Sequence, residues 1–423
     1  MVKTIYHFFP NLGTELSSIV DPRKCRHYSI EEIVFAGIAM FLFKCGSRNV
    51  MDSFAKRSPK FKKNYRKAFG HRLSDMDTVA VVLNKLLPEE LENLKTILVS
   101  RLLEKRVFDK WRFQGHVVIA IDGTGIVSFG HRHCPRCIKK VSKNGKTTWM
   151  HNVLEAKLVT DNGFSISLCT EWIENPGIEY NKQDCERKAF ERLAQKQKDN
   201  FPRLAICLCA DGLYPNNTFF GICQRFGWKY IVTLKDGNLK SLWKNIRHQN
   251  REALIIPQDN KGNPRQEFQW LNNIEVNGYV HNWVELNETI TDKQNTVAKQ
   301  RFVHLTNIEI TQQCAPHISR TGRLRWKIEN QGFDIQKNHG YNICHKYCQK
   351  SYNGLKNFYQ CCQIAHMFNQ LIELSKAIQA LLVDKTSLAF LWEYLRWTMA
   401  LGYINAGQIE YIKCHRTQIQ FKT

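Results

Sequence analysis

The sequence predicts an α/β protein in which a mixed sheet is flanked by helices. Two short, continuous apolar runs at residues 117–121 and 204–210 are typical of strands that are buried on both faces. Helical periodicity comes before, between and after them, and a turn-rich β segment lies past residue 236. We divide the chain into five regions. Residues 1–113 are a helical N-terminal region, 114–235 the first part of the core, 236–320 a β-rich insertion, 321–350 a returning helix of the core, and 351–423 a helical C-terminal region.

The N-terminal region is predicted to be helical. Ser29 and Glu32 form a capping box ahead of the apolar residues 33–43, and Pro88 opens a second helix with leucines on one face. A basic stretch at residues 56–67 separates the two helices. It is either a solvated helix face or a surface whose cations contact DNA phosphates.

The core segment, residues 114–235, alternates strands and helices. The strand at residues 117–121 is expected to end in an Asp-Gly-Thr-Gly turn at residues 122–125. The remaining predicted elements are a hairpin of strands 153–160 and 164–169, a helix at 184–198, a strand at 204–210, a helix after Pro215 that Gly227 terminates, and a strand at 230–234.

The insertion is predicted to be β-rich because Asn277 and Gly278 give a strong hairpin signal. Trp270 and Trp283 lie in this insertion. Helical periodicity returns near Arg323, where Arg325 and Glu329 are four residues apart and share a helix face. That spacing by itself indicates only a surface ion pair.

Composition narrows the classes of partner. The chain has 61 Lys and Arg against 38 Asp and Glu, a formal net charge of +23, which favours a polyanion such as nucleic acid. The apolar run at residues 33–43 is too short to cross a bilayer, and no secretion signal precedes it. We expect no membrane association, a cytoplasmic protein, and fifteen cysteines that are mostly reduced thiols.

Both buried core strands are followed by Asp-Gly, at Asp122 and Asp211. Taken singly, each is more simply a turn, because Asp bonds its own backbone and Gly accepts positive φ. As a pair at the ends of neighbouring strands, they would bring two carboxylates together. Such carboxylates repel unless a cation lies between them, and oxygen ligands favour Mg²⁺ or Mn²⁺.

The order of these features resembles the DDE-type insertion-sequence transposases whose RNase H-like core carries a β-strand insertion domain. The resemblance covers residues 117–341. It rests on a strand ending at Asp122, a strand ending at Asp211, a β insertion, and then a helix with Arg325 and Glu329. It implies that Asp122, Asp211 and Glu329 are catalytic and hold two Mg²⁺ or Mn²⁺ ions.

The resemblance also implies an activity and partners. Water would cleave a phosphodiester at the transposon end, and the released 3′-OH would attack target DNA. The partner would be double-stranded DNA, bound by a homodimer, and the protein would be associated with the bacterial nucleoid. Dimerisation could use the apolar segment around Phe358, Ile364, Phe368 and Ile372, although this segment could equally pack within the chain.

Residues near Glu329 are implied to bind DNA. Arg325 would steady a phosphate. Family members carry a Tyr three residues before that Arg and a Lys seven residues after the Glu, whereas this chain has Gly322 and Gln336 there, with Lys337 next. On an α-helix Lys337 would lie about 80° from Glu329, so it would have to lean, and Gln336 could take its place. An aromatic residue of the insertion would stack on a base, but Trp270 and Trp283 fit a β-domain core equally well.

A loop beyond Asp122 offers possible zinc ligands, His131, His133, Cys134 and Cys137. Cys-x-x-Cys is a zinc half-site, yet structural sites take their second pair of ligands from elsewhere, and His151, Cys344, His345 and Cys348 are candidates. The loop is therefore either a structural Zn²⁺ site or a plain basic loop. Its lysines, which include Lys139, Lys140 and Lys143, suit contact with the DNA backbone.

Two other functions remain open. The chain could be a nuclease or resolvase of the same fold, which hydrolyses DNA without joining it. It could also be a non-catalytic DNA-binding protein derived from a transposase.

Overall fold

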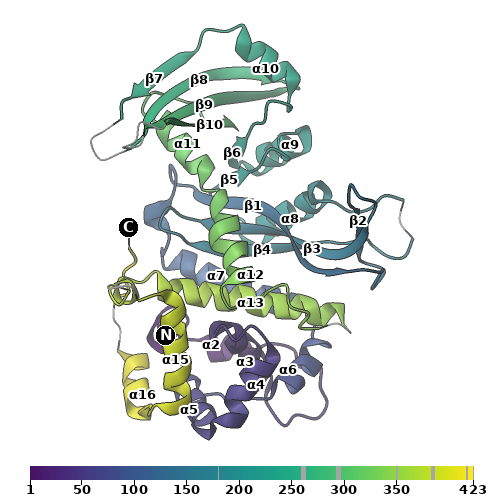
Figure 1. Ribbon diagram of the computed structural model, residues 1–423, viewed down its shortest axis with the longest axis vertical. Coiled ribbons are helices and arrows are strands. Elements are labelled where there is room, and N and C mark those ends of the chain that lie inside the picture. Colours follow the sequence, from purple (N-terminus) through teal and green to yellow (C-terminus); the bar gives the residue numbers. More distant parts are fainter. Residues whose placement is uncertain are drawn as a thin grey trace.

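One large mixed sheet organises the molecule, with helices on its faces and a helical layer along one side (Figure 1). The computed structural model describes residues 1–179, 181–258, 263–291, 297–348, 351–382, 386–415 and 418–422. The predicted α/β class is confirmed. Within these residues the strands are β1 (Val117–Phe129), β2 (Ile138–Val141), β3 (Thr147–Val159), β4 (Ser165–Ile173), β5 (Ile206–Ala210), β6 (Lys229–Thr233), β7 (Glu252–Ile256), β8 (Arg265–Val276), β9 (Tyr279–Thr291) and β10 (Val297–Thr306).

Neighbouring strands follow the order β2-β3-β1-β5-β6-β10-β9-β8-β7, and β4 also pairs with β3. The pairs β1–β5 and β5–β6 are parallel, and the remaining pairs are antiparallel. The predicted β-rich insertion therefore does not form a sheet of its own. Its last strand, β10, pairs with β6, so it extends the core sheet.

The helices of the described residues are found near both ends of the sequence and between the strands, and in space they lie on both faces of the sheet. They are α1 (Val2–Phe8), α2 (Leu12–Ser17), α3 (Ile30–Leu42), α4 (Arg48–Arg57), α5 (Pro59–Phe69), α6 (Met76–Leu83), α7 (Pro88–Glu104), the 3-10 turn η1 (Asp109–Trp111), α8 (Glu186–Asn200), α9 (Asn217–Phe226), α10 (Lys240–Arg247), α11 (Ala315–Arg323), the π-helix η2 (Ile328–Asp334), α12 (Ile335–Asn338), α13 (Tyr352–Glu373), α14 (Lys376–Gln379), α15 (Leu388–Leu401) and α16 (Ala406–Cys414).

Several local predictions are confirmed. The Ser29 side chain accepts from the Glu32 N–H, and the Glu32 carboxylate accepts from the Ser29 N–H, which completes the capping box of α3. Gly227 ends α9 at φ 68°. Asn277 and Gly278, at φ 54° and 80°, form the tight β8–β9 turn. Each is a case where short-range chemistry alone sets the backbone.

β1 is longer than predicted. The sequence placed its end at the Asp-Gly-Thr-Gly of residues 122–125, but the strand continues to Phe129, paired with β3 through an irregularity between Gly125 and Val127. The glycines were interpreted as a turn, whereas here they lie in an extended strand. The Glu186 side chain packs closely on Gly123, where a Cβ would lie 2.6 Å from a Glu186 carboxylate oxygen.

α13 lies between the sheet and the N-terminal helices (Figure 1). Phe358, Ile364, Phe368 and Ile372 are buried on it, so the alternative of intramolecular packing is confirmed for this segment. Asn369 donates from its side chain to the carbonyl of Leu42 at the end of α3. The two helical regions, at opposite ends of the sequence, thus pack against each other.

Two further findings concern the described residues. No helix among them is both long and apolar enough to cross a bilayer. The cysteines are free thiols, with no disulfide among them. The predicted domain boundary at residue 350 lies outside the residues that the structure describes.

Candidate active site

Asp122 lies within β1, just past the part of that strand that pairs with β5, and Asp211 directly follows the end of β5. Ala120 on β1 is beside Cys209 on β5, so Asp122 and Asp211, each two residues further along, follow in register. Strands in a sheet are about 4.8 Å apart. The two aspartates therefore lie on neighbouring segments of the backbone, as the sequence predicts, and the meeting of their carboxylates at a metal site stays a prediction.

Each aspartate also makes the local hydrogen bond expected of an Asp-Gly. Asp122 accepts from the Gly123 N–H at 3.0 Å, and Asp211 accepts from the Leu213 N–H at 2.8 Å. The second oxygen of Asp211 is 3.6 Å from the Lys235 ammonium. The local backbone bond of each aspartate therefore uses one carboxylate oxygen, and the other oxygen faces a cation, Lys235 for Asp211 and Arg325 for Asp122.

Glu329 joins Asp122 from the π-helix η2. Burial, followed by the hydrogen bond to Glu329 and its negative charge, raises the pKa of Asp122 to about 7. A proton shared between the two acids accounts for this direction, since two ionised carboxylates in contact repel. Segments more than 200 residues apart in the chain therefore bring their acidic groups together.

Arg325 lies against both of these acids. Its Nη1 is 3.1 Å from Glu329 and 3.7 Å from Asp122, and the side chain is 12% exposed. The ion pair suggested by the spacing of Arg325 and Glu329 is thus confirmed. The Arg325 Nε is buried and has no hydrogen-bond partner among the described residues. The guanidinium therefore has a donor left over.

Glu186, which the sequence did not single out, is a fourth acidic group at this site. It opens α8, and its carboxylate lies directly over Gly123. Burial, and then the charge of Asp211, raises the pKa of Glu186. Tyr214 lies among the same groups, and burial together with the charges of Glu186, Asp122 and Asp211 raises its pKa as well. No local pattern marks Glu186, because any acidic residue is favourable in the first turn of a helix.

Lys337 reaches the site without leaning. Its Nζ donates to the Thr124 hydroxyl at 2.7 Å, two residues beyond Asp122. The predicted angle of about 80° from Glu329 assumed an α-helix, and that assumption is wrong here. The intervening η2 is a π-helix, whose wider turns take up one extra residue. Lys337, eight residues after Glu329, therefore points in the direction that a residue seven positions after Glu329 would take on an α-helix.

Gln336 does not take the place of that lysine. It is 0% exposed, and its amide donates to Gln363 and contacts the His366 ring. A side chain enclosed in this way cannot reach a phosphate, so the prediction that Gln336 binds DNA is wrong. The same π-helix accounts for the burial of Gln336, because its extra residue turns this side chain into the core.

Gly322, where the resembled family has a tyrosine, packs closely against the sheet. A Cβ at Gly322 would lie 2.6 Å from the His304 ring and 2.8 Å from Ile231. The helix α11 therefore approaches the sheet too closely at this point for any side chain.

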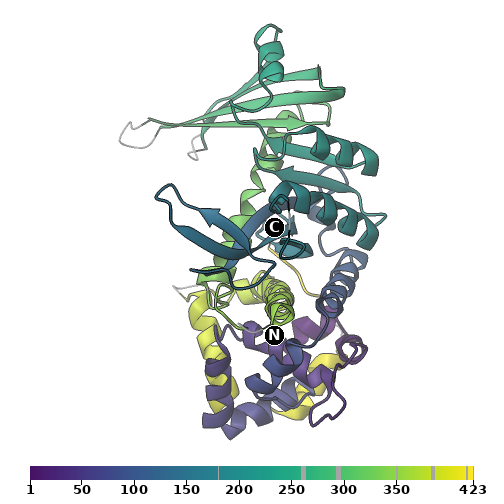
Figure 2. The same cartoon turned by 90° about the vertical axis from the view of Figure 1, so that its right-hand side faces the viewer.

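Trp270 and Trp283 are core residues of the extended sheet. They are 1% and 0% exposed, so the core interpretation is confirmed for both and neither is positioned to stack on a base. The lysines predicted to contact DNA lie elsewhere, exposed on the β2–β3 hairpin, which stands out from the body in Figure 2: Lys139, Lys140 and Lys143.

The donors at the active site suit a hard divalent cation. Asp122, Asp211, Glu329 and Glu186 offer only carboxylate oxygens, the ligand type that Mg²⁺ and Mn²⁺ prefer. Their positive partners here are Arg325 and Lys235. Burial, and then the contact with Glu329, raise the pKa of Asp122 although the charge of Arg325 lowers it.

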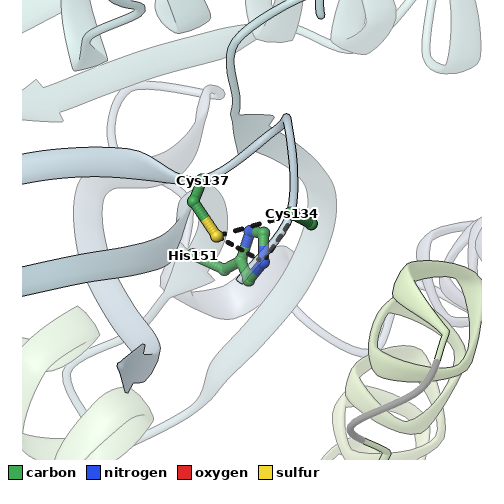
Figure 3. Close-up of side chains that lie close together, drawn as sticks. All are labelled: Cys134, Cys137 and His151. Atoms are coloured by element: carbon green, nitrogen blue, oxygen red, sulfur yellow. Dashed lines mark hydrogen bonds between the residues drawn. The ribbon is translucent and has the colours of Figure 1, made fainter. Parts of the chain in front are cut away.

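The possible zinc residues are only partly brought together. Cys134 and Cys137 lie side by side, but their partner is His151 of β3 (Figure 3). His131 is not part of this group, and the His133 ring stacks on Phe129 at 4.1 Å. The prediction of His131 and His133 as ligands is therefore wrong, because sequence proximity does not fix the direction of a loop side chain. The other candidates point elsewhere, with Cys344 at Gly125 and Cys348 at Asn84.

No protein-family model matches the chain, and a comparison with curated proteins finds no match.

Proposed function

We propose that the chain is a DDE-type DNA transposase, which cleaves phosphodiester bonds at transposon ends and joins the freed 3′-OH to target DNA. One observation carries the proposal: the Asp122 carboxylate contacts Glu329 from a distant helix, and Asp122 lies on the strand next to the one that Asp211 follows. A carboxylate cluster of this kind serves phosphoryl transfer, which depends on charge compensation and positioning.

The surroundings of the cluster support this proposal. A mixed sheet with helices on its faces, interrupted before the helix of Glu329 by a β segment, agrees with an RNase H-like core carrying an insertion. The formal charge of +23 favours a polyanionic substrate. The exposed lysines of the β2–β3 hairpin would lie along the DNA backbone.

Asp122, Asp211 and Glu329 would hold the divalent ions, with Glu186 next to them. When bound, such ions activate the attacking oxygen and stabilise the leaving oxygen. The side chains of the protein would position the phosphates of the DNA. Arg325 loses its acidic partners once cations compensate them, and its guanidinium is then available for a phosphate oxygen. Lys337, beside Thr124, would hold a second phosphate contact.

The test is incubation of the full chain with duplex DNA carrying the element's own ends and a plasmid target, in Mg²⁺. The wild type should nick at the end and join the 3′-OH to the plasmid. Glu329→Gln should lose both products by at least about 10³-fold, whereas Glu275→Gln, an exposed acid on β8, should keep them. Cutting without joining would indicate a nuclease, and retained joining in Glu329→Gln would overturn the assignment.

A further inference from the structure

A second cluster of metal-binding side chains lies outside the acidic site. Cys134 and Cys137 come from the loop between β1 and β2, and His151 comes from β3 (Figure 3). The two sulfurs are 3.5 Å apart, and each is 3.4 Å from the His151 Nε2. The three ligand atoms thus form a nearly equilateral triangle.

The dimensions of this triangle are those of a zinc site. With Zn–S of about 2.3 Å and Zn–N of about 2.0–2.1 Å, a tetrahedral ion separates two sulfurs by about 3.8 Å and a sulfur from a nitrogen by about 3.6 Å. The observed distances differ from these values by no more than about 0.3 Å. A disulfide does not account for the arrangement, since its sulfurs are about 2.05 Å apart and it has no use for a nitrogen equidistant from both.

The loop that carries the two cysteines is also held by hydrogen bonds. The Cys137 N–H donates to the Cys134 carbonyl at 3.3 Å. Asn175, which is buried, donates from its side chain to the Cys137 carbonyl at 2.9 Å and from its backbone to the Arg136 carbonyl at 3.2 Å. Such supporting hydrogen bonds fix the direction of metal ligands.

The His151 ring is held in place by its neighbours. It stacks on Tyr352 at 4.4 Å, and its backbone is paired with Val127 of β1. Its Nε2 therefore faces the two sulfurs from a rigid strand, as a metal ligand must.

We infer that Cys134, Cys137 and His151 bind one Zn²⁺ ion, with water in the fourth position, and that this ion ties the β1–β2 loop to the base of the β2–β3 hairpin. Cys137 directly precedes β2, and β2 begins at Ile138. The ion thereby fixes the direction in which Lys139, Lys140 and Lys143 project. This inference stands apart from the proposed DNA chemistry, because neither metal content nor hairpin order depends on it.

The first test is metal analysis of the full chain, purified without chelators. We expect one zinc per chain in the wild type, and background zinc in Cys134→Ser and His151→Gln. Cys344→Ser and His345→Gln are matched controls outside the cluster and should keep the ion. Glu329→Gln should keep it too, so failure of the active-site proposal is distinguishable from failure of this one. Zinc content that is unchanged in Cys134→Ser overturns the inference.

A second measurement avoids variants that fail to fold. Wild-type protein loaded with Co²⁺ should show a thiolate-to-cobalt charge-transfer band, and a mercurial thiol reagent should abolish that band. Chelation of the native protein should also increase proteolytic cleavage after the hairpin lysines, while cleavage after Lys24 and Lys85 in the helical region stays constant. Absence of the band, or cleavage that does not respond to chelation, overturns the inference.

Discussion

At the scale of single residues, the site is governed by an unbalanced charge. Asp122 and Glu329 are in contact, and Arg325 lies against both with one guanidinium nitrogen. One cation facing two acids leaves a proton or a metal ion to supply the remaining charge. The spacing of Arg325 and Glu329 therefore predicts their ion pair. It does not predict that Asp122, from a distant strand, also contacts Arg325.

Asp122→Asn should remove a pH dependence of stability in the metal-free protein. Burial and Glu329 raise the pKa of Asp122 from 3.8 to about 7. The folded state thus binds this proton more tightly than the unfolded state, so the stabilisation is complete below about pH 4 and is lost as the pH rises to about 7.

Relative to Asp122→Asn, the free energy of unfolding of the wild type should fall by about 1–3 kcal/mol over that range. Urea denaturation in EDTA at several pH values measures it. Asp77→Asn, an 88% exposed carboxylate paired with Arg48, is the control. Parallel curves for the wild type and Asp122→Asn would contradict the raised pKa.

Gly322→Ala should destabilise the fold by about 1–3 kcal/mol, although alanine favours helices. The new Cβ would collide with the buried His304 ring and with Ile231. Gly13→Ala is the matched control, because no atom lies within 4 Å of its Cβ, and it should be neutral or slightly stabilising. Denaturant midpoints compare the two, and a neutral Gly322→Ala would show that α11 can move away from the sheet.

At the scale of elements, the π-helix η2 lets its buried residues face the core while Lys337 faces the active site. Ile328, Phe333 and Gln336 are all buried, at intervals of five and three residues. On an α-helix the first interval would turn Phe333 about 140° away from Ile328. The extra residue in the π-turn brings these side chains onto one face, and the same adjustment directs Lys337 toward Thr124.

Deleting Gln331 should therefore be tolerated. It shortens the first interval to four, which an α-helix accommodates, and it leaves Lys337 seven residues from Glu329. Inserting alanine after Gln331 should instead rotate Lys337 by about 100° and abolish DNA cleavage. Cleavage within about tenfold of wild type is expected for the deletion. Equal damage from the two changes would mean that the π-turn itself is required.

At the scale of the whole molecule, the sheet sets where charge can act. The acidic residues lie within β1 and after the end of β5. The β2–β3 hairpin, which carries exposed lysines, projects from the same sheet (Figure 2). The helical regions at both chain ends pack together, with Asn64 of α5 donating to the carbonyls of Met399 and Gly402. The basic surface of α4 and α5 therefore belongs to the helical layer that the two ends of the chain form together.

Replacing Lys139, Lys140 and Lys143 together by alanine should reduce the salt dependence of DNA binding. Each lost phosphate contact lowers the slope of log K against log[salt] by about 0.9, so the triple variant should lose about 2–3. Fluorescence anisotropy over a salt series measures this slope. Alanine at Lys24, Lys85 and Lys105, exposed lysines of the helical region, is the matched control. An unchanged slope in the hairpin variant would place the DNA elsewhere.

The sequence by itself determined the features that depend on neighbours in the chain. The buried strands ahead of Asp122 and Asp211, the capping box of Ser29, the Gly227 terminus and the Asn277-Gly278 turn all follow from periodicity and backbone chemistry within a few residues. The acidic trio was not marked in this way, because Glu329 by its spacing from Arg325 indicates only an ion pair and was implied as catalytic by the resemblance to a transposase family.

Only the tertiary structure decided what depends on distant contacts. Glu186 at the acidic site, His151 beside Cys134, and the burial of Gln336 all arise where separate elements meet. The π-turn of η2 belongs here too, because the helix adopts it to bury residues against the sheet and α13. Local propensity cannot show such choices, since the energy that selects them comes from packing against partners far away in the chain.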